Sequence, residues 1–136
     1  MSFPPYTVQD TSGPGILYVN SKIKDPTLSS HLFAKWYEQV HIPHIFETKP
    51  KGISSAFRYY SVHPSESERP YLALYPLKDV KFLQTDAFRR IPVHSDLLPG
   101  NGPIFHMADF DTRYYTHMKT VINGRTKTGK IVNVLS

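Results

Sequence analysis

Two of the seven histidines stand where an imidazole could do chemistry. His41 lies near the end of a helical pattern, where the helix dipole favours a cation, and imidazole exchanges protons near neutral pH. His106 lies in a β-type run, on the same face as Ile104, Ala108 and Phe110. An imidazole at His41 could therefore accept or donate a proton, and His106 is the second histidine to consider. The alternatives are a helix-end histidine bonded to backbone carbonyls and an ordinary core histidine.

His44 follows His41 by three residues, a spacing that can hold a metal ion if the helix continues. Zinc typically takes roughly three or four protein ligands, and no H-E-x-x-H motif or carboxylate cluster completes such a set. The chain has no cysteine, which excludes thiolate ligands, disulfides and a cysteine nucleophile. No G-x-S-x-G turn marks a serine nucleophile. We therefore expect no metal site.

Two pairs of polar side chains share strand faces in the sequence pattern. Tyr18 and Asn20 alternate along one β-type run, and Arg58 and Tyr60 along another. Arginine can clamp an anion, while tyrosine and asparagine can donate hydrogen bonds to a carbonyl or carboxylate. We predict these four as ligand-binding residues. The alternative is that Arg58 pairs with a surface carboxylate and the tyrosines pack an interface.

The aromatic content suits a pocket for a flat, apolar ligand. Nine tyrosines, eight phenylalanines and one tryptophan would equally fill an ordinary core. Trp36, on the helical pattern, is a further candidate ligand-binding residue. His94, in a loop near Asp96, is a candidate lid residue, with a plain surface histidine as the alternative.

Six periodic segments must position these residues. Strand patterns cover 15–23, 54–63, 71–77 and 104–112, and helical patterns cover 31–42 and 79–91. Pro43 should end or kink the first helix, and Pro76 indicates an edge strand or a strand end. The order βαββαβ predicts an α+β, ferredoxin-like fold with a four-stranded antiparallel sheet and helices on one face. The uncovered face and edges favour a twofold homodimer.

Charge divides the chain into a neutral body and a basic tail. The net charge is +5, but residues 119–136 contain four basic side chains and no acidic one. We therefore expect an irregular arm at 1–14, one domain at 15–118, and a basic tail or hairpin at 119–136. No P-loop, G-x-G-x-x-G or RNA-recognition motif is present, so no nucleic-acid partner is expected. No signal segment and no run of about 18 apolar residues is present, which favours a cytoplasmic protein without a membrane partner.

The segment WYEQVHIP (36–43), together with this element order, resembles the EthD-like proteins of the dimeric α/β-barrel superfamily, which carry a W-x(3–4)-H-x-P signature. The similarity to fungal EthD-like proteins covers residues 15–115. Those relatives usually have aspartate directly after the proline, where this chain has His44. The basic tail lies outside the resemblance.

The resemblance implies a cofactor-independent enzyme of fungal-type secondary metabolism. It would be an acid/base lyase, cyclase or isomerase acting on a small hydrophobic, polyketide-like carbonyl compound, with His41 and His106 as the proton-transfer residues. Two alternatives stay open. One is a non-catalytic small-ligand-binding or stress-related protein, and the other is a haem-binding member with His41, His44 or His106 as the axial ligand.

Overall fold

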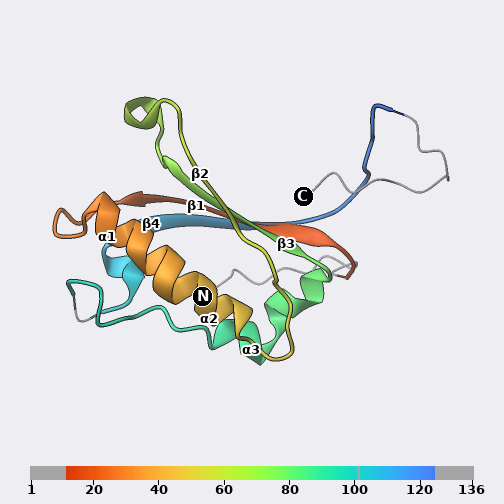
Figure 1. Cartoon of the computed structure of the whole chain (residues 1–136), viewed down its shortest axis with the longest axis horizontal. Helices are drawn as coiled ribbons and strands as arrows, with labels where there is room; N and C mark the ends of the chain where they lie inside the picture. Colours follow the sequence, from red (N-terminus) through yellow and green to blue (C-terminus); the bar gives the residue numbers. More distant parts are fainter. Residues whose placement is uncertain (1–11, 101, 125–136) are drawn as a thin grey trace.

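A computed structural model describes residues 12–100 and 102–124 of the 136-residue chain. Its centre is one antiparallel sheet with the order β2-β3-β1-β4. The α-helices all lie on one side of this sheet (Figure 1). The strands are β1 (Gly15–Ile23), β2 (Phe57–Tyr60), β3 (Tyr71–Leu77) and β4 (Ala108–Thr116). This arrangement confirms the α+β, ferredoxin-like prediction.

The two faces of the sheet differ in burial. On β1, Leu17, Val19 and Ser21 are buried beneath the helices, while Tyr18 and Asn20 between them are half-buried on the opposite face. We call this opposite side the open face. The alternation follows from the two-residue period of a strand with one covered side. The predicted division of β1 into two faces is therefore confirmed.

The first helix passes through Pro43 instead of ending before it. It comprises α1 (Ser30–Trp36), a π-helical turn (Tyr37–His41) and α2 (Ile42–Phe46). The backbone N–H of Ile42 donates to the carbonyl of Tyr37, five residues earlier. This wider turn relieves the clash between a proline ring and the preceding turn, so of the two predicted outcomes at Pro43, an end or a kink, the structure excludes the end.

The second helical region is broken. The sequence pattern predicts one helix over 79–91, but the structure has a 3₁₀ helix at Val80–Gln84 and the short helix α3 at Asp86–Arg89. Thr85 between them is extended, with φ −82° and ψ 155°, and its side chain accepts a hydrogen bond from the N–H of Phe88. A capping threonine offers the backbone an alternative to a continuous helix, and this explains the break.

The fourth strand is displaced from its predicted position. It begins at Ala108, whereas Ile104–His106 forms a 3₁₀ turn that follows Pro103. The Ile104 N–H donates to the carbonyl of Val93 at 2.7 Å, which ties this turn to the preceding loop. The sequence pattern predicts His106 on a strand. That prediction is wrong, because His106 is exposed on a turn.

The structure shortens the predicted second strand and places the third strand inside the sheet. β2 keeps only four residues of the predicted 54–63, and a 3₁₀ turn at Pro64–Glu66 leads back to β3. β3 lies inside the sheet, but Pro76 lies near its end. The last β3 residue that β2 reaches is Leu74, opposite Phe57. Pro76 therefore needs no N–H toward β2, and its predicted place at a strand end is confirmed.

The described part of the tail adds no strand to the sheet. Residues 117–124 contain no regular element, and the second half of the predicted tail hairpin lies outside the described residues. Within residues 12–100 and 102–124, no helix is long and apolar enough to cross a membrane.

Candidate functional site

Tyr37 occupies the centre of a polar cluster between the helix and the sheet. Its side chain is almost fully buried, and it meets Phe33 edge-on at 5.2 Å between ring centres. The guanidinium carbon of Arg58, from β2, lies 4.6 Å from the centre of the Tyr37 ring. Arg58 also donates to a carboxylate oxygen of Glu38 at 2.9 Å. One cation therefore joins the edge of the sheet to the π turn.

Two further hydroxyl groups lie in this cluster. Tyr75 from β3 and Ser21 from β1 are each 1% exposed. Burial raises the pKa of both Tyr37 and Tyr75, and the Arg58 charge offsets part of each rise. The Ser21 side chain lies beside the Tyr37 hydroxyl, although its own oxygen makes no well-formed hydrogen bond. Both phenols stay protonated at neutral pH and are hydrogen-bond donors.

His41 borders the cluster on the helix. Its ring stacks on Trp36 at 4.6 Å and meets Tyr37 edge-on at 5.6 Å. Burial lowers the pKa of His41 to about 3, and the nearby His44 adds to this, although a hydrogen bond to the backbone of Pro92 opposes the shift. The cation that the helix dipole would favour is therefore absent, because desolvation outweighs the dipole.

The bonding of His41 defines which nitrogen is available. Proline has no N–H, so the imidazole must donate to the Pro92 carbonyl. Nδ1 is buried and has no hydrogen-bond partner among the described residues. The donor is therefore Nε2, and Nδ1 keeps its lone pair. His41 presents an acceptor, and a potential base, to the protein interior.

Three buried polar atoms in this region have no hydrogen-bond partner among the residues that the structure describes: Ser21 Oγ, Tyr75 OH and His41 Nδ1. An unsatisfied buried polar group costs about 1–3 kcal/mol. Such groups are uncommon in native proteins, and each calls for a water, an ion or a ligand. The tyrosine–arginine cluster, which we define as Ser21, Tyr37, Arg58 and Tyr75, combines two of these atoms with a cation, and His41 adds the third.

Tyr60 stands at the outer side of this cluster. It shares the helix-facing side of β2 with Arg58, as the sequence pattern predicts, and is 56% exposed. Its ring lies 5.0 Å from that of Tyr71. Burial raises the pKa of Tyr71, Tyr60 raises it further, and Arg58 lowers it. Arg58 therefore acts electrostatically on three tyrosines.

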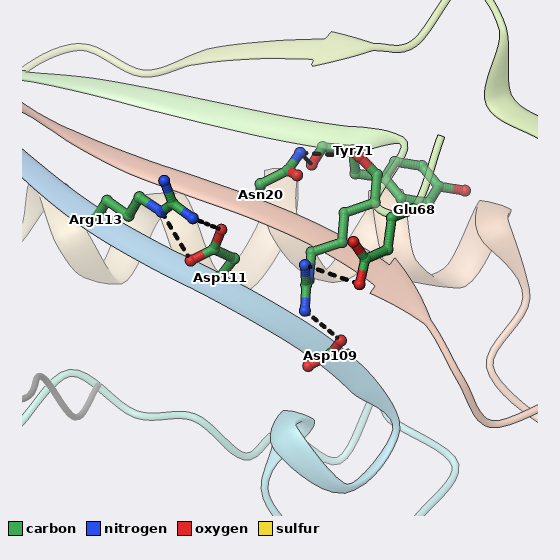
Figure 2. A network of polar contacts seen from close by, with 7 residues as sticks. Asn20, Glu68, Tyr71, Asp109, Asp111 and Arg113 are labelled. Atoms are coloured by element: carbon green, nitrogen blue, oxygen red, sulfur yellow. Dashed lines mark hydrogen bonds and ion pairs between the residues drawn. The ribbon is translucent and has the colours of Figure 1, made fainter. Parts of the chain in front are cut away.

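Tyr18 and Asn20 lie on the open face, away from the cluster. The Asn20 amide donates to the carbonyls of Arg69 and Tyr71 at 2.9 and 2.8 Å, and so anchors the start of β3 (Figure 2). Tyr18 meets Tyr115 edge-on at 6.3 Å. The sheet thus separates these two predicted ligand-binding residues from Arg58, Tyr60, Trp36 and His41.

His94 and His106 belong to the loop that also supplies Pro92. Both are exposed, and His94 Nδ1 lies 2.8 Å from the carbonyl oxygen of Gly102. A Cβ at Gly102 would lie 2.3 Å from Nδ1 of His106, so only glycine allows this ring to pack so closely. No group of three or more potential metal ligands occurs among the described residues.

The sequence analysis missed Tyr37, Tyr75 and Ser21. The sequence pattern does place all three on the buried faces of their elements. The alternation in YLALYPL places Tyr71, Ala73 and Tyr75 on one face, and Ser21 continues the face of Leu17 and Val19. Tyr37 shares the helical spacing of Phe33. What the sequence lacks is the rotation of the helix relative to the strands, which alone brings these hydroxyls together.

The structure is that of a ferredoxin-like α+β protein in which the tyrosine–arginine cluster lies between the first helix and the sheet. The chain is 33% identical over 120 residues to core atranone cluster (CAC) protein 1 of Stachybotrys chlorohalonatus (strain IBT 40285). The match covers 85% of this chain and 49% of the relative, so the chain spans about half the relative's length. No family model matches the chain, and no solved structure matches it.

Proposed function

We propose that the tyrosine–arginine cluster and His41 bind a small hydrophobic carbonyl compound, and that the protein is a cofactor-independent, cytoplasmic enzyme of secondary metabolism. The reaction class is an acid/base lyase, cyclase or isomerase reaction. The observation that carries this proposal is the set of three buried polar atoms around Tyr37 that find no hydrogen-bond partner within residues 12–100 and 102–124. Two are hydroxyls and one is an imidazole nitrogen with a free lone pair.

The arrangement suits enolisation. A carbonyl oxygen placed between Ser21 and Tyr75 would receive hydrogen bonds that strengthen as the oxygen gains negative charge. Arg58 would stabilise that charge over a slightly longer distance. His41 Nδ1 would take the proton from the α-carbon and return it at another position. Trp36, stacked on His41, would form the aromatic wall.

With its pKa lowered to about 3 by burial, His41 by itself is a weak base. An enolate bound beside His41 would favour the imidazolium, because a neighbouring opposite charge raises the pKa of a histidine. The pKa of His41 would then rise only while the enolate is bound. This is the pattern expected of a site that stabilises the transition state more than the free ligand.

The comparison supports the setting of this proposal. The relative is named as a protein of the core atranone cluster. We propose that this chain likewise acts in a biosynthetic cluster and is EthD-like, which the W36-x(4)-H41-x-P43 motif and the ferredoxin-like fold support. The proposal retains Trp36, His41, Arg58 and Tyr60 from the sequence analysis. Tyr18, Asn20, His94 and His106 lie elsewhere.

The binding test uses the chain's single tryptophan, Trp36, which stacks on His41. Benzoylacetone, an enolisable aromatic diketone, is titrated while Trp36 fluorescence is recorded. We expect saturable quenching that weakens on the order of tenfold in Tyr75→Phe, since one hydrogen bond is lost. Tyr18→Phe, on the open face, is the control and should bind like the wild type. Equal affinity in all three proteins would overturn the site.

A non-catalytic ligand-binding protein is the second candidate. The pKa of His41 near 3 favours it, because such a base removes protons from carbon slowly. Both candidates predict the same quenching. They differ in whether the α-hydrogens of bound benzoylacetone exchange with D₂O faster than in buffer.

We also propose that the protein is a homodimer. The helices cover only one face of the sheet, and both β2 and β4 are edge strands within the described residues. Large apolar side chains on the open face, among them Tyr59 and Tyr115, remain about half exposed. A second copy would cover such surfaces economically.

A further inference from the structure

His44 has no role in the function proposed above, although it lies three residues after His41 on the same helix. The helix continues through Pro43 by way of the π turn, so the two side chains keep helical spacing. Side chains three residues apart on a helix are neighbours, with about 5–6 Å between their Cβ atoms. The two imidazoles also interact electrostatically, which agrees with this spacing.

The two rings share the same bonding state. Nδ1 of His41 and Nδ1 of His44 are both buried, and neither has a hydrogen-bond partner among the described residues. Buried polar atoms without a partner are uncommon in native proteins. An imidazole nitrogen accepts or donates a hydrogen bond according to its tautomer. Two such atoms on neighbouring rings therefore indicate a joint role in handling a proton.

The two histidines differ in their access to water. His41 is 4% exposed, and its Nε2 donates to the Pro92 carbonyl. His44 is half-buried, and of its two nitrogens only Nδ1 is a buried atom without a partner. Since no hydrogen bond holds Nε2 of His44 within the described part of the chain, this nitrogen is open to solvent. Water accepts a hydrogen bond from an exposed Nε2–H, and this tautomer leaves the buried Nδ1 as an acceptor.

We propose that His44 relays protons between His41 and solvent, a role that rests on the enolisation of the proposed function. His41 Nδ1 takes the proton from the α-carbon, and the electron pair of that C–H bond stays on the ligand as the enolate. The proton then passes from His41 Nδ1 to His44 Nδ1, directly or through one water, and His44 releases its Nε2 proton to solvent. The return of a proton to the ligand follows the same path backwards and restores the starting tautomer of His44.

The electrostatics of the pair favour this transfer. Burial lowers the pKa of His41 to about 3, and His44 contributes to the shift because the two rings repel each other when both are charged. A buried imidazolium at His41 therefore loses its proton readily, and the half-buried ring of His44 lies next to it on the helix. Without this partner, His41 would return the same proton to the ligand, and no hydrogen from solvent would enter. His44 thus acts through His41 and is a positioning residue for the proton.

The test is the exchange of the α-hydrogens of benzoylacetone in D₂O by the full chain, compared between the wild type, His44→Gln and His44→Phe. Glutamine accepts a hydrogen bond but does not carry a proton, and phenylalanine does neither. We expect both changes to slow the protein-catalysed exchange on the order of tenfold, with an unchanged circular dichroism spectrum and unchanged quenching of Trp36 by benzoylacetone. His31→Gln, at the exposed start of the same helix, is the control and should exchange at the wild-type rate.

Chemical rescue distinguishes a relay from a structural role. Free imidazole added to His44→Gln should restore exchange in proportion to its concentration, after subtraction of the rate in the same buffer without protein, and should change the wild-type rate little. An undiminished rate in His44→Gln, or a loss that imidazole does not restore, would overturn the relay and leave the proposed function standing. A wild type that exchanges no faster than buffer would overturn both the relay and the proposed enzyme.

Discussion

The imidazole of His41 illustrates how burial overrides a local rule at the scale of one residue. A histidine in the last turn of a helical pattern is expected to gain positive charge from the helix dipole. Here the ring is 4% exposed, stacked on Trp36 and tied to the Pro92 carbonyl. Burial holds its pKa near 3, so it enters the proposed chemistry as a neutral acceptor.

This burial predicts an acid-sensitive fold. The unfolded chain binds a proton on His41 below about pH 6.5, whereas the folded chain does so only near pH 3. Stability is therefore complete above pH 6.5 and falls as the pH drops toward 3, by about 1.4 kcal/mol per unit. Urea unfolding at pH 7.5 and 5.5 should show this loss. In His41→Gln the loss should be smaller by about 1.4 kcal/mol; an identical loss in both proteins would contradict the buried neutral histidine.

The Tyr75 hydroxyl should strengthen ligand binding without stabilising the fold. It is buried without a partner among the described residues, so its removal leaves no group unpaired. We expect Tyr75→Phe to unfold with a free energy equal to the wild type or higher by up to about 1 kcal/mol, although it binds benzoylacetone more weakly. Urea denaturation measures this change. A loss of stability above about 1 kcal/mol would mean that the hydroxyl is already bonded in the free protein.

Arg58 links two elements, the edge strand β2 and the π turn. Its partner Glu38 is 63% exposed, whereas the ring below it, Tyr37, is buried. An exposed ion pair contributes little, and a cation over a buried ring contributes more. Glu38→Gln should therefore change the free energy of unfolding by less than about 0.5 kcal/mol, and Arg58→Met should lower it by about 1 kcal/mol. Equal effects of the two changes would assign the contribution to the ion pair.

Element boundaries were harder to predict than element order. Helical spacing continues across Thr85 and stops at Pro43, yet the structure breaks at the threonine and continues through the proline. In both places a backbone detail decides: Thr85 caps α3, and a π turn accommodates Pro43. Neither leaves a trace in hydrophobic periodicity, which reports only which side of an element is apolar.

Across the whole molecule, the sequence predicts the fold class and only some of the residues of the site that we propose. Strand alternation correctly groups Tyr18 with Asn20 and Arg58 with Tyr60, but it does not say which face the helices cover. Because the helices cover the face that carries Arg58 and Tyr60, this pair lies beside Tyr37. Tyr18 and Asn20 lie on the open face. The partners of Tyr37 come from three strands far apart in the chain, so only the assembled sheet brings them together.

The two sides of the sheet also differ in the side chains that they carry. The helix-facing side holds the tyrosine–arginine cluster, and the open face and the β4 edge carry the exposed aromatic and charged side chains. The proposed ligand site and the exposed aromatic side chains of the open face thus lie on opposite sides of the sheet.

The most direct test of the proposed chemistry is the exchange of the α-hydrogens of benzoylacetone in D₂O, followed by proton NMR. The account predicts that the wild type accelerates exchange over buffer, that His41→Gln abolishes the acceleration while Trp36 quenching persists, and that Tyr18→Phe behaves as the wild type. Exchange at the buffer rate in the presence of saturating wild-type protein, or undiminished acceleration by His41→Gln, would contradict it.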